Sequence, residues 1–205
     1  MSRPILIALD QQAPQAWRNG GGITRELFAW PAGPLWRWRV SVADITQDGP
    51  FSAYEGIDRW FAVIQGAGVR LGLPGASPLP LHRDSAPLSF DGAEAPNCSL
   101  IDGATRDLNL MSRRDAGRST LQRAAAGQVW RSGAALRALF STEAVSLRID
   151  GQAPLAMPAG TLAVSPQAAH QRWQLQTVGA PWQVGDTPLQ AWWLDFQAST
   201  PGGRP

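Results

Sequence analysis

The amino-acid sequence predicts an all-β protein, and three observations carry this prediction. Apolar and polar side chains alternate along residues 36–43 and again along 107–111, which is the period-two pattern of a strand with one buried face. The 21 glycines and 17 prolines are scattered along the chain, as is typical of short strands joined by turns. No long segment has the 3.6-residue apolar period of a helix. These patterns favour a barrel or a sandwich.

Gln65–Gly68 separates two of the expected strands and predicts a hairpin with glycines in its connection. Residues 74–87 read as a loop, 113–122 as a polar connection and 199–205 as a disordered tail. The expected strands are 5–9, 23–29, 36–43, 60–64, 69–73, 107–111, 136–141, 145–149, 160–164, 173–176 and 191–196.

Composition limits the partners and the compartment. All 18 basic residues are arginines, the net charge is only +2, and the arginines form no basic stripe, so we expect no nucleic-acid partner. The single cysteine, Cys98, permits no intrachain disulfide, which fits a reducing cytoplasm. We find no signal peptide and no apolar stretch of the roughly 20 residues that a membrane span needs. We therefore expect a cytoplasmic protein without a membrane partner.

Few residues are suited to metal or nucleophilic chemistry. The chain has only two histidines, His82 and His170, each isolated in sequence, whereas a metal site usually needs three or more ligands. Cys98 lacks an activating neighbour and reads as a small buried hydrophobe. No Gly-x-Ser-x-Gly elbow occurs. We expect no metal, no cofactor and no catalytic residue.

A run of three glycines, Gly20–Gly22, allows two interpretations. Its backbone N–H groups could converge on an anion, together with the guanidinium groups of Arg39 and Arg59. Alternatively, the run is a tight turn that Asn19 caps, as Asn-Gly sequences often are at strand ends. Local physics favours the turn.

Several motifs follow one another in the first half of the chain, beginning with Trp17-Arg18-Asn19-Gly20-Gly21-Gly22-x-Thr24-Arg25-Glu26. The motifs after it are Trp38–Ile45, Gly49–Ser52, Gly56–Arg59, Gly66–Gly68, Pro87–Gly92 and Asp107–Arg114. Together and in this order they resemble the motifs of the HutD/Ves family, in which lysine is common at the position of Arg18. Pro158-Ala159-Gly160 also resembles the turn of the second cupin motif, with Ala163 in place of its metal-binding histidine.

The resemblance implies a bicupin fold, with two jelly-roll-like β-barrel halves in one chain, at residues 1–112 and 113–198. For the HutD branch it implies a regulatory role in histidine utilisation through binding of a small acidic metabolite, such as formylglutamate or urocanate. The Ves branch is linked instead to stress response. Two further alternatives stay open: a metal-free cupin isomerase or hydrolase that uses Glu26 and Asp107 as acid or base, and an interaction protein with an exposed aromatic patch. We expect a monomer or a homodimer.

The resemblance also implies the ligand-binding residues. Arg39 and Arg59 would bind a carboxylate, with Glu26 and Asp107 orienting them, while Trp17, Trp38, Phe51 and Phe90 would form the walls. Trp17 and Trp38 could equally be core residues, which is the favoured interpretation for Trp38. The expected ligand-binding residues are Asn19, Thr24, Arg25, Glu26, Arg39, Ser41, Ser52, Arg59, Asp107 and Asn109.

Overall fold

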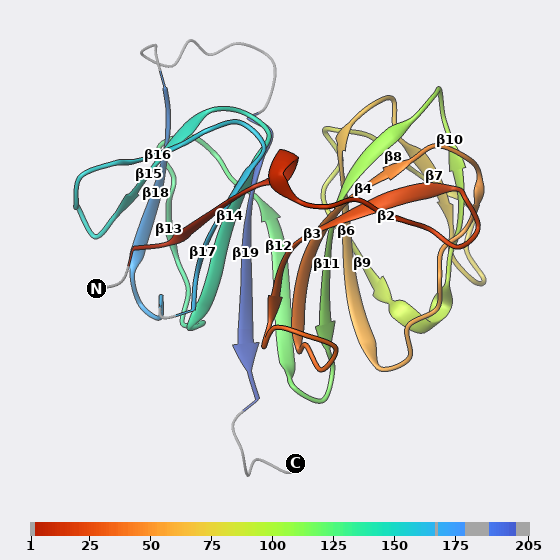
Figure 1. Cartoon of the computed structure of the whole chain (residues 1–205), viewed down its shortest axis with the longest axis horizontal. Helices are drawn as coiled ribbons and strands as arrows, with labels where there is room; N and C mark the ends of the chain where they lie inside the picture. Colours follow the sequence, from red (N-terminus) through yellow and green to blue (C-terminus); the bar gives the residue numbers. More distant parts are fainter. Residues whose placement is uncertain (1–2, 167, 179–188, 200–205) are drawn as a thin grey trace. The chain divides into compact units, whose positions relative to one another are not determined.

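The computed structural model describes residues 3–166, 168–178 and 189–199, and nearly all of its regular structure is antiparallel strand (Figure 1). The two described helices are single 3-10 turns, η1 (Leu9–Gln11) and η2 (Gly92–Glu94). The chain divides into two compact units, each with two sheets. We call them the first barrel (Gln12–Ser119 and Ser199–Pro205) and the second barrel (Met1–Gln11 and Thr120–Ala198). The predicted all-β class is confirmed.

The first barrel consists of a six-stranded and a four-stranded sheet. In spatial order the larger sheet contains β2 (Gln15–Ala16), β3 (Gly22–Trp30), β4 (Trp38–Ile45), β11 (Thr105–Arg113), β6 (Ile57–Gln65) and β9 (Leu88–Asp91). The smaller sheet contains β5 (Gly49–Pro50), β10 (Asn97–Leu100), β7 (Val69–Gly72) and β8 (Leu79–Leu81).

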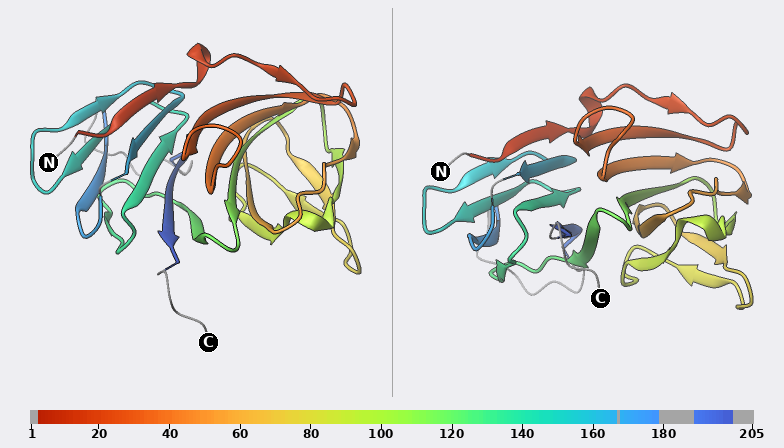
Figure 2. Two further views of the ribbon diagram at one scale, coloured as in Figure 1. Left: turned by 60° about the horizontal axis from the view of Figure 1, so that its bottom comes forward. Right: turned by 90° about the horizontal axis from the view of Figure 1, so that it is seen from below.

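The core of the first barrel joins its two sheets. Phe61 and Val63 of β6 pack in one buried cluster with Val69, Leu71 and Cys98 of the smaller sheet. Figure 2 shows β7 and β8 lying across from β3 and β4. The alternation predicted for residues 36–43 holds from Trp38 onward: Trp38, Val40 and Val42 are fully buried, and their neighbours point to the other face of β4.

The second barrel also has two sheets. The larger contains β1 (Ile5–Ala8), β17 (Thr161–Ser165), β14 (Leu136–Ser141), β19 (Ala191–Ala198) and β12 (Gly117–Arg123). The smaller contains β13 (Val129–Arg131), β18 (Arg172–Thr177), β15 (Val145–Ile149) and β16 (Leu155–Met157).

Tryptophans fill the interior of the second barrel. The indole rings of Trp130 and Trp193 stack at a centroid distance of 4.8 Å, and Trp173 meets both rings edge-on. The fully buried Arg137 places its guanidinium over Trp130, 4.2 Å from the ring centroid. Aromatic stacking and cation–π contact stabilise this interior.

The boundaries of the halves differ from the expected 1–112 and 113–198. The first strand, β1, pairs with β17 through partners such as Ile5 and Val164, so residues 3–11 belong with the second barrel. Backbone hydrogen bonds of an edge strand do not depend on where the strand lies in the chain. The expected tail, 199–205, lies outside the described residues except for Ser199.

Two local predictions are wrong. Gln65–Gly68 does not close a hairpin, because β6 and β7 belong to different sheets of the first barrel. Gly66 and Gly68 have φ of 92° and 108°, and a Cβ on Gly68 would collide with the carbonyl oxygen of Leu81. The glycines therefore turn the chain from one sheet to the other. Residues 74–87 are also more than a loop, because they contain β8 at Leu79–Leu81. Residues 113–122 do connect the two units, whose boundary lies between Ser119 and Thr120, and they contain the start of β12 at Gly117.

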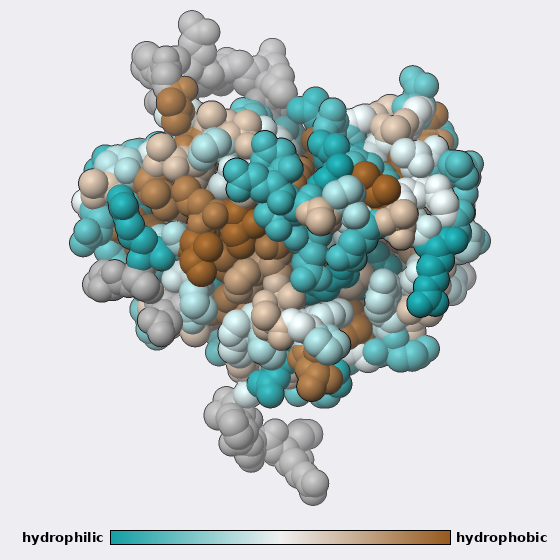
Figure 3. All heavy atoms as spheres, in the orientation of Figure 1, coloured by the Kyte–Doolittle hydropathy of each residue, from teal (hydrophilic) through white to brown (hydrophobic). Residues whose placement is uncertain are grey.

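The surface carries no exposed aromatic patch in the described part of the chain. None of the described tryptophans is exposed, and the most exposed large apolar residues are aliphatic. On the face in Figure 3, apolar side chains gather over β1, where Ile5 is 54% exposed. Neither described helix has the length or the apolar composition that crossing a membrane requires.

Candidate functional site

The first barrel holds a cavity of about 700 Å³ on one face of its six-stranded sheet. Residues from β2, β3, β4, β6 and β11 line it, together with two loops, 17–19 and 51–54. The lining residues are Gln15, Ala16, Trp17, Arg18, Asn19, Thr24, Arg39, Ser41, Ala43, Pro50, Phe51, Ser52, Tyr54, Arg59, Asp107, Asn109 and Met111.

Strand register arranges the polar groups on the cavity floor in three rows. In the first row, Thr24 of β3 pairs with Ala43, and Ala43 pairs with Asp107. In the second row, Ser41 of β4 lies opposite Asn109 of β11. The third row places Met111 between two arginines, because it pairs with Arg39 on one side and with Arg59 on the other. Since alternate residues share a face, all three rows face the same cavity.

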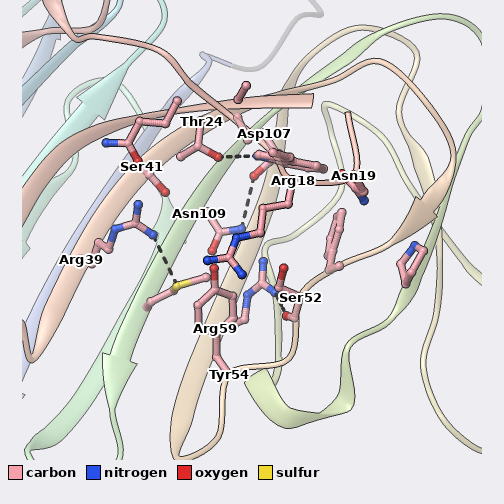
Figure 4. Close-up of a pocket in the computed structure, with 17 residues that line it drawn as sticks. Arg18, Asn19, Thr24, Arg39, Ser41, Ser52, Tyr54, Arg59, Asp107 and Asn109 are labelled. Carbon is pink, nitrogen blue, oxygen red and sulfur yellow. Dashed lines mark hydrogen bonds between the residues drawn. The ribbon is translucent and has the colours of Figure 1, made fainter. Parts of the chain in front are cut away.

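Arg39 is held in place by an ion pair. Its Nε donates to Oε2 of Glu26 at 2.6 Å, and its Nη1 lies 4.0 Å from the sulfur of Met111 (Figure 4). The contact with Glu26 occupies one edge of the guanidinium, and the side chain still lines the cavity. This ion pair orients Arg39 toward the cavity.

Arg59 is the more deeply buried arginine, with 5% of its surface exposed. Its guanidinium carbon lies 5.1–5.6 Å from the ring centroids of Phe51, Tyr54 and Phe90. The group forms no ion pair with a described carboxylate, and its Nε has no hydrogen-bond partner. Burial lowers the pKa of Arg59 to about 10, partly offset by Asp107, so the guanidinium stays charged at neutral pH.

Asp107 is the one acidic residue in the cavity lining, and it is 1% exposed. Its Oδ1 accepts a long hydrogen bond of 3.5 Å from Nδ2 of Asn109, while Oδ1 of Asn109 has no partner. Burial raises the pKa of Asp107 to about 7, although Arg59 and Asn109 act in the opposite direction. This carboxyl group therefore changes its protonation state near neutral pH.

Arg18 lies at the rim, on the loop between β2 and β3. It is exposed and has neither a hydrogen bond nor an ion pair with the described residues. Figure 4 shows the side chains of Arg18, Arg39 and Arg59 directed toward the same space. Three guanidinium groups thus face one cavity whose lining includes a single carboxyl group.

Eight of the ten expected ligand-binding residues line this cavity, and Arg25 and Glu26 do not. Arg25 follows Thr24 on β3, so its side chain points to the opposite face, where Nη1 bonds Oδ2 of Asp44 at 2.8 Å. Glu26 reaches the site only through its ion pair with Arg39. The expected role of Glu26 in orienting an arginine agrees with this contact.

Two of the four aromatic residues expected to form the walls line the cavity. Trp17 and Phe51 line the cavity and meet edge-on at a centroid distance of 6.1 Å. Trp38 is fully buried and does not line the cavity, and Phe90 packs in the core cluster of the first barrel, where its ring lies 5.1 Å from the guanidinium carbon of Arg59. Sequence reasoning missed Arg18 and Tyr54 as lining residues. Arg18 lies inside the first motif, but nothing local indicates that its side chain turns back over the sheet.

The three glycines form a tight turn. Gly21 N–H donates to Oδ1 of Asn19 at 3.1 Å, and Gly20 N–H donates to the carbonyl of Trp17 at 3.1 Å. None of Gly20–Gly22 lines this cavity, so their backbone does not form one site with Arg39 and Arg59. The turn instead positions Trp17, whose Nε1 donates to Oγ1 of Thr24 at 2.8 Å.

Gly22→Ala tests how this turn supports the cavity wall. A Cβ at Gly22 would collide with the carbonyl oxygen of Asp44 and lie 3.2 Å from the ring of Trp17. We expect a loss of about 1–3 kcal/mol in the free energy of unfolding, measured with urea, and a shifted tryptophan fluorescence spectrum. Gly72→Ala is the control, because its Cβ would meet Asn97 only at 3.8 Å. Equal stability of the two variants would contradict the tight packing.

The histidines lie apart from the cavity. His82 is exposed, and its Nδ1 lies 2.9 Å from the carbonyl oxygen of Ala67, while His170 belongs to the second barrel. Ala163, in the position of the cupin histidine, is fully buried on β17. Among the described residues, no three His, Cys, Asp or Glu side chains are grouped as metal ligands would be.

Two antiparallel barrels in one chain, one with an arginine-lined cavity, define a bicupin. A cupin 2 conserved barrel domain protein from Leptotrichia buccalis has the same fold, with a TM-score of 0.55 over 96% of this chain and 98% of that one at 9% identity. More specifically, this chain belongs to the HutD family, whose sequence model matches residues 9–182.

Named relatives agree with this membership. HutD from Pseudomonas fluorescens SBW25, whose structure was solved in a formate condition, superposes with a TM-score of 0.79 at 25% identity, covering 96% of this chain and 99% of that one. An uncharacterised 21.2 kDa protein in the hutC 3′ region of Pseudomonas putida is 36% identical over 60% of this chain. Protein Ves of Cronobacter sakazakii is 36% identical over 52% of it. These matches span 65% and 59% of the two relatives.

Proposed function

We propose that this protein binds a small anionic metabolite in the cavity of the first barrel and thereby regulates histidine utilisation. The observation that carries the proposal is the convergence of Arg18, Arg39 and Arg59 on one cavity. Arginine presents several N–H donors in a planar fork that matches a carboxylate.

The charges in the cavity favour an anion. Glu26 compensates Arg39 along one edge only, Arg18 has no partner among the described residues, and Arg59 forms no ion pair. The one carboxyl group in the lining, Asp107, has its pKa raised to about 7 and is therefore only partly ionised at neutral pH. A ligand with one or two carboxylates would supply the missing negative charge.

The dimensions and the walls fit a metabolite. A cavity of about 700 Å³ lies within the range of small-molecule sites, and Trp17 and Phe51 supply apolar walls. Ser41, Asn109 and Thr24 add neutral polar groups that could contact an amide or an imidazole. Formylglutamate has two carboxylates and a formamide, while urocanate has one carboxylate and an imidazole. The family name and the hutC-region relative support a link to histidine degradation.

Arg39→Gln tests the proposal by calorimetric titration with formylglutamate, urocanate and glutamate. We expect the native protein to bind one of the first two ligands, and the variant to bind it about 10- to 100-fold more weakly, because a hydrogen bond to a charged group contributes about 1.5–3 kcal/mol.

Arg25→Gln is the matched control. It removes the same charge from the other face of the same sheet, where Arg25 pairs with Asp44, so affinity should stay within about twofold. Absence of binding by the native protein at millimolar ligand would refute the proposal. Equal weakening by both substitutions would show that the cavity arginine makes no specific contact.

A further inference from the structure

Asp107 occupies an unfavourable position for a site that binds anions. It lines the cavity at 1% exposure, and no described guanidinium forms an ion pair with it. Its single hydrogen bond within the described residues is the 3.5 Å contact from Asn109. A carboxylate arriving on Arg39 and Arg59 would therefore meet a second, buried carboxyl group that competes with it for the same guanidinium groups.

We propose that the cavity takes up one proton with each bound anionic ligand, and that Asp107 is the residue that receives it. This inference rests on the proposed anion binding and adds to it the regulation of that site by pH. Once protonated, Asp107 no longer repels the ligand, and its O–H becomes a hydrogen-bond donor on the cavity floor. Two carboxyl groups that share a confined site commonly hold one proton between them.

The charged and titratable groups around Asp107 come from several neighbouring elements. Arg39 comes from β4, Arg59 from β6 and Arg18 from the β2–β3 loop, and Tyr54 lies on the loop after β5. Glu26 of β3 acts through Arg39, Asp44 lies on the opposite face of β4, and Cys98 approaches from β10.

Cys98, Arg59 and Asp44 each keep one protonation state near neutral pH. Burial raises the pKa of Cys98 to about 12, so the thiol stays neutral, and Arg59 with a pKa of about 10 stays charged. Hydrogen bonds from Arg106 and Arg25 hold the pKa of Asp44 below its usual value, against the effect of burial, so it stays ionised. The pKa of Asp107, raised to about 7 by burial, agrees with a proton acceptor at this position.

Calorimetry on the native protein measures the proton directly. N-formylglutamate is the probe, because its carboxyl groups titrate far below neutral pH and its formamide does not titrate. Titrations in two buffers of different ionisation enthalpy should give an uptake of about one proton per ligand at about pH 8.5, and close to none at about pH 5.5, where Asp107 is already protonated. Kd should rise about tenfold from about pH 8 to about pH 9.

Asp107→Asn should remove this dependence, because the amide cannot titrate, so Kd should become flat across the same range. Asp58→Asn is the control: Asp58 is next to Arg59 in sequence, pairs with Arg114 outside the cavity, and should leave the native pH slope intact. Binding without proton uptake would overturn this inference and leave the proposed function standing, as would a pH slope that survives in Asp107→Asn. Absence of N-formylglutamate binding at every pH would overturn both the proton uptake and the proposed function for this ligand.

Discussion

Replacing Arg137 with methionine is expected to destabilise the second barrel by about 3–5 kcal/mol, one of the two largest effects that the structure predicts. Arg137 is fully buried on β14. Its Nη1 donates to the carbonyl oxygens of Ala168 at 3.0 Å and Gln171 at 2.6 Å, and its Nη2 donates to that of Trp130 at 3.2 Å. Methionine fills a similar volume but removes all three of these buried hydrogen bonds, and the carbonyl oxygen of Ala168 keeps only its bond from Gln171 N–H at 3.2 Å.

Urea denaturation followed by tryptophan fluorescence measures this effect, since Arg137 also lies against Trp130 and Trp173. Arg131→Met is the matched control, because it makes the same substitution on exposed β13, next to Trp130. We expect the control to change the free energy of unfolding by less than about 0.5 kcal/mol. Coincident unfolding curves for the two variants would show that the three carbonyls find other donors at little cost.

Replacing Asp107 with asparagine is expected to stabilise the protein at about pH 8, by an amount on the order of 4 kcal/mol. Burial raises the pKa of Asp107 in the folded protein from 3.8 to about 7. The folded state therefore binds more protons than the unfolded state between these two values, and stability falls as pH rises through this window. The contribution of protonated Asp107 to the free energy of unfolding is fully present below about pH 4 and is lost above about pH 7.

Urea denaturation of native protein and Asp107→Asn at several pH values tests the sign. The difference in unfolding free energy should grow from about pH 4 to about pH 7 and then level off, because asparagine has no charge to bury. Asp58→Asn should show no such growth, since Asp58 is partly exposed and paired with Arg114. A loss of stability in Asp107→Asn at about pH 8 would mean that the fold stabilises the ionised carboxylate.

Local alternation accounts for the parts of the site that the sequence predicted. Residues 36–43 and 107–111 each carry polar side chains at every second position, and the structure places Arg39, Ser41, Asp107 and Asn109 on the cavity floor. The same rule separates Arg25 from Thr24, although the motif that contains both residues does not distinguish them. Alternation along a strand indicates which side chains share a face of the sheet, whereas membership of a motif does not.

Two glycine-containing connections differ in how well their sequences predict their geometry. The turn capped by Asn19 followed from its dipeptide, and its hydrogen bond to Gly21 N–H is present. The connection at Gly66–Gly68 has an equally clear glycine pattern, yet it joins two sheets instead of closing a hairpin. A positive φ satisfies both geometries, and only the strands that pair on either side distinguish them.

The sequence by itself determined the all-β class, the strands with clear alternation and their buried faces, and the family, because side-chain alternation and ordered motifs are properties of neighbouring residues. Only the tertiary structure decided that β1 joins the second barrel and that Arg18 turns toward Arg39 and Arg59. It also decided that Asp107 is buried with a raised pKa. These features depend on pairing and desolvation between residues far apart in the chain, which no local pattern encodes.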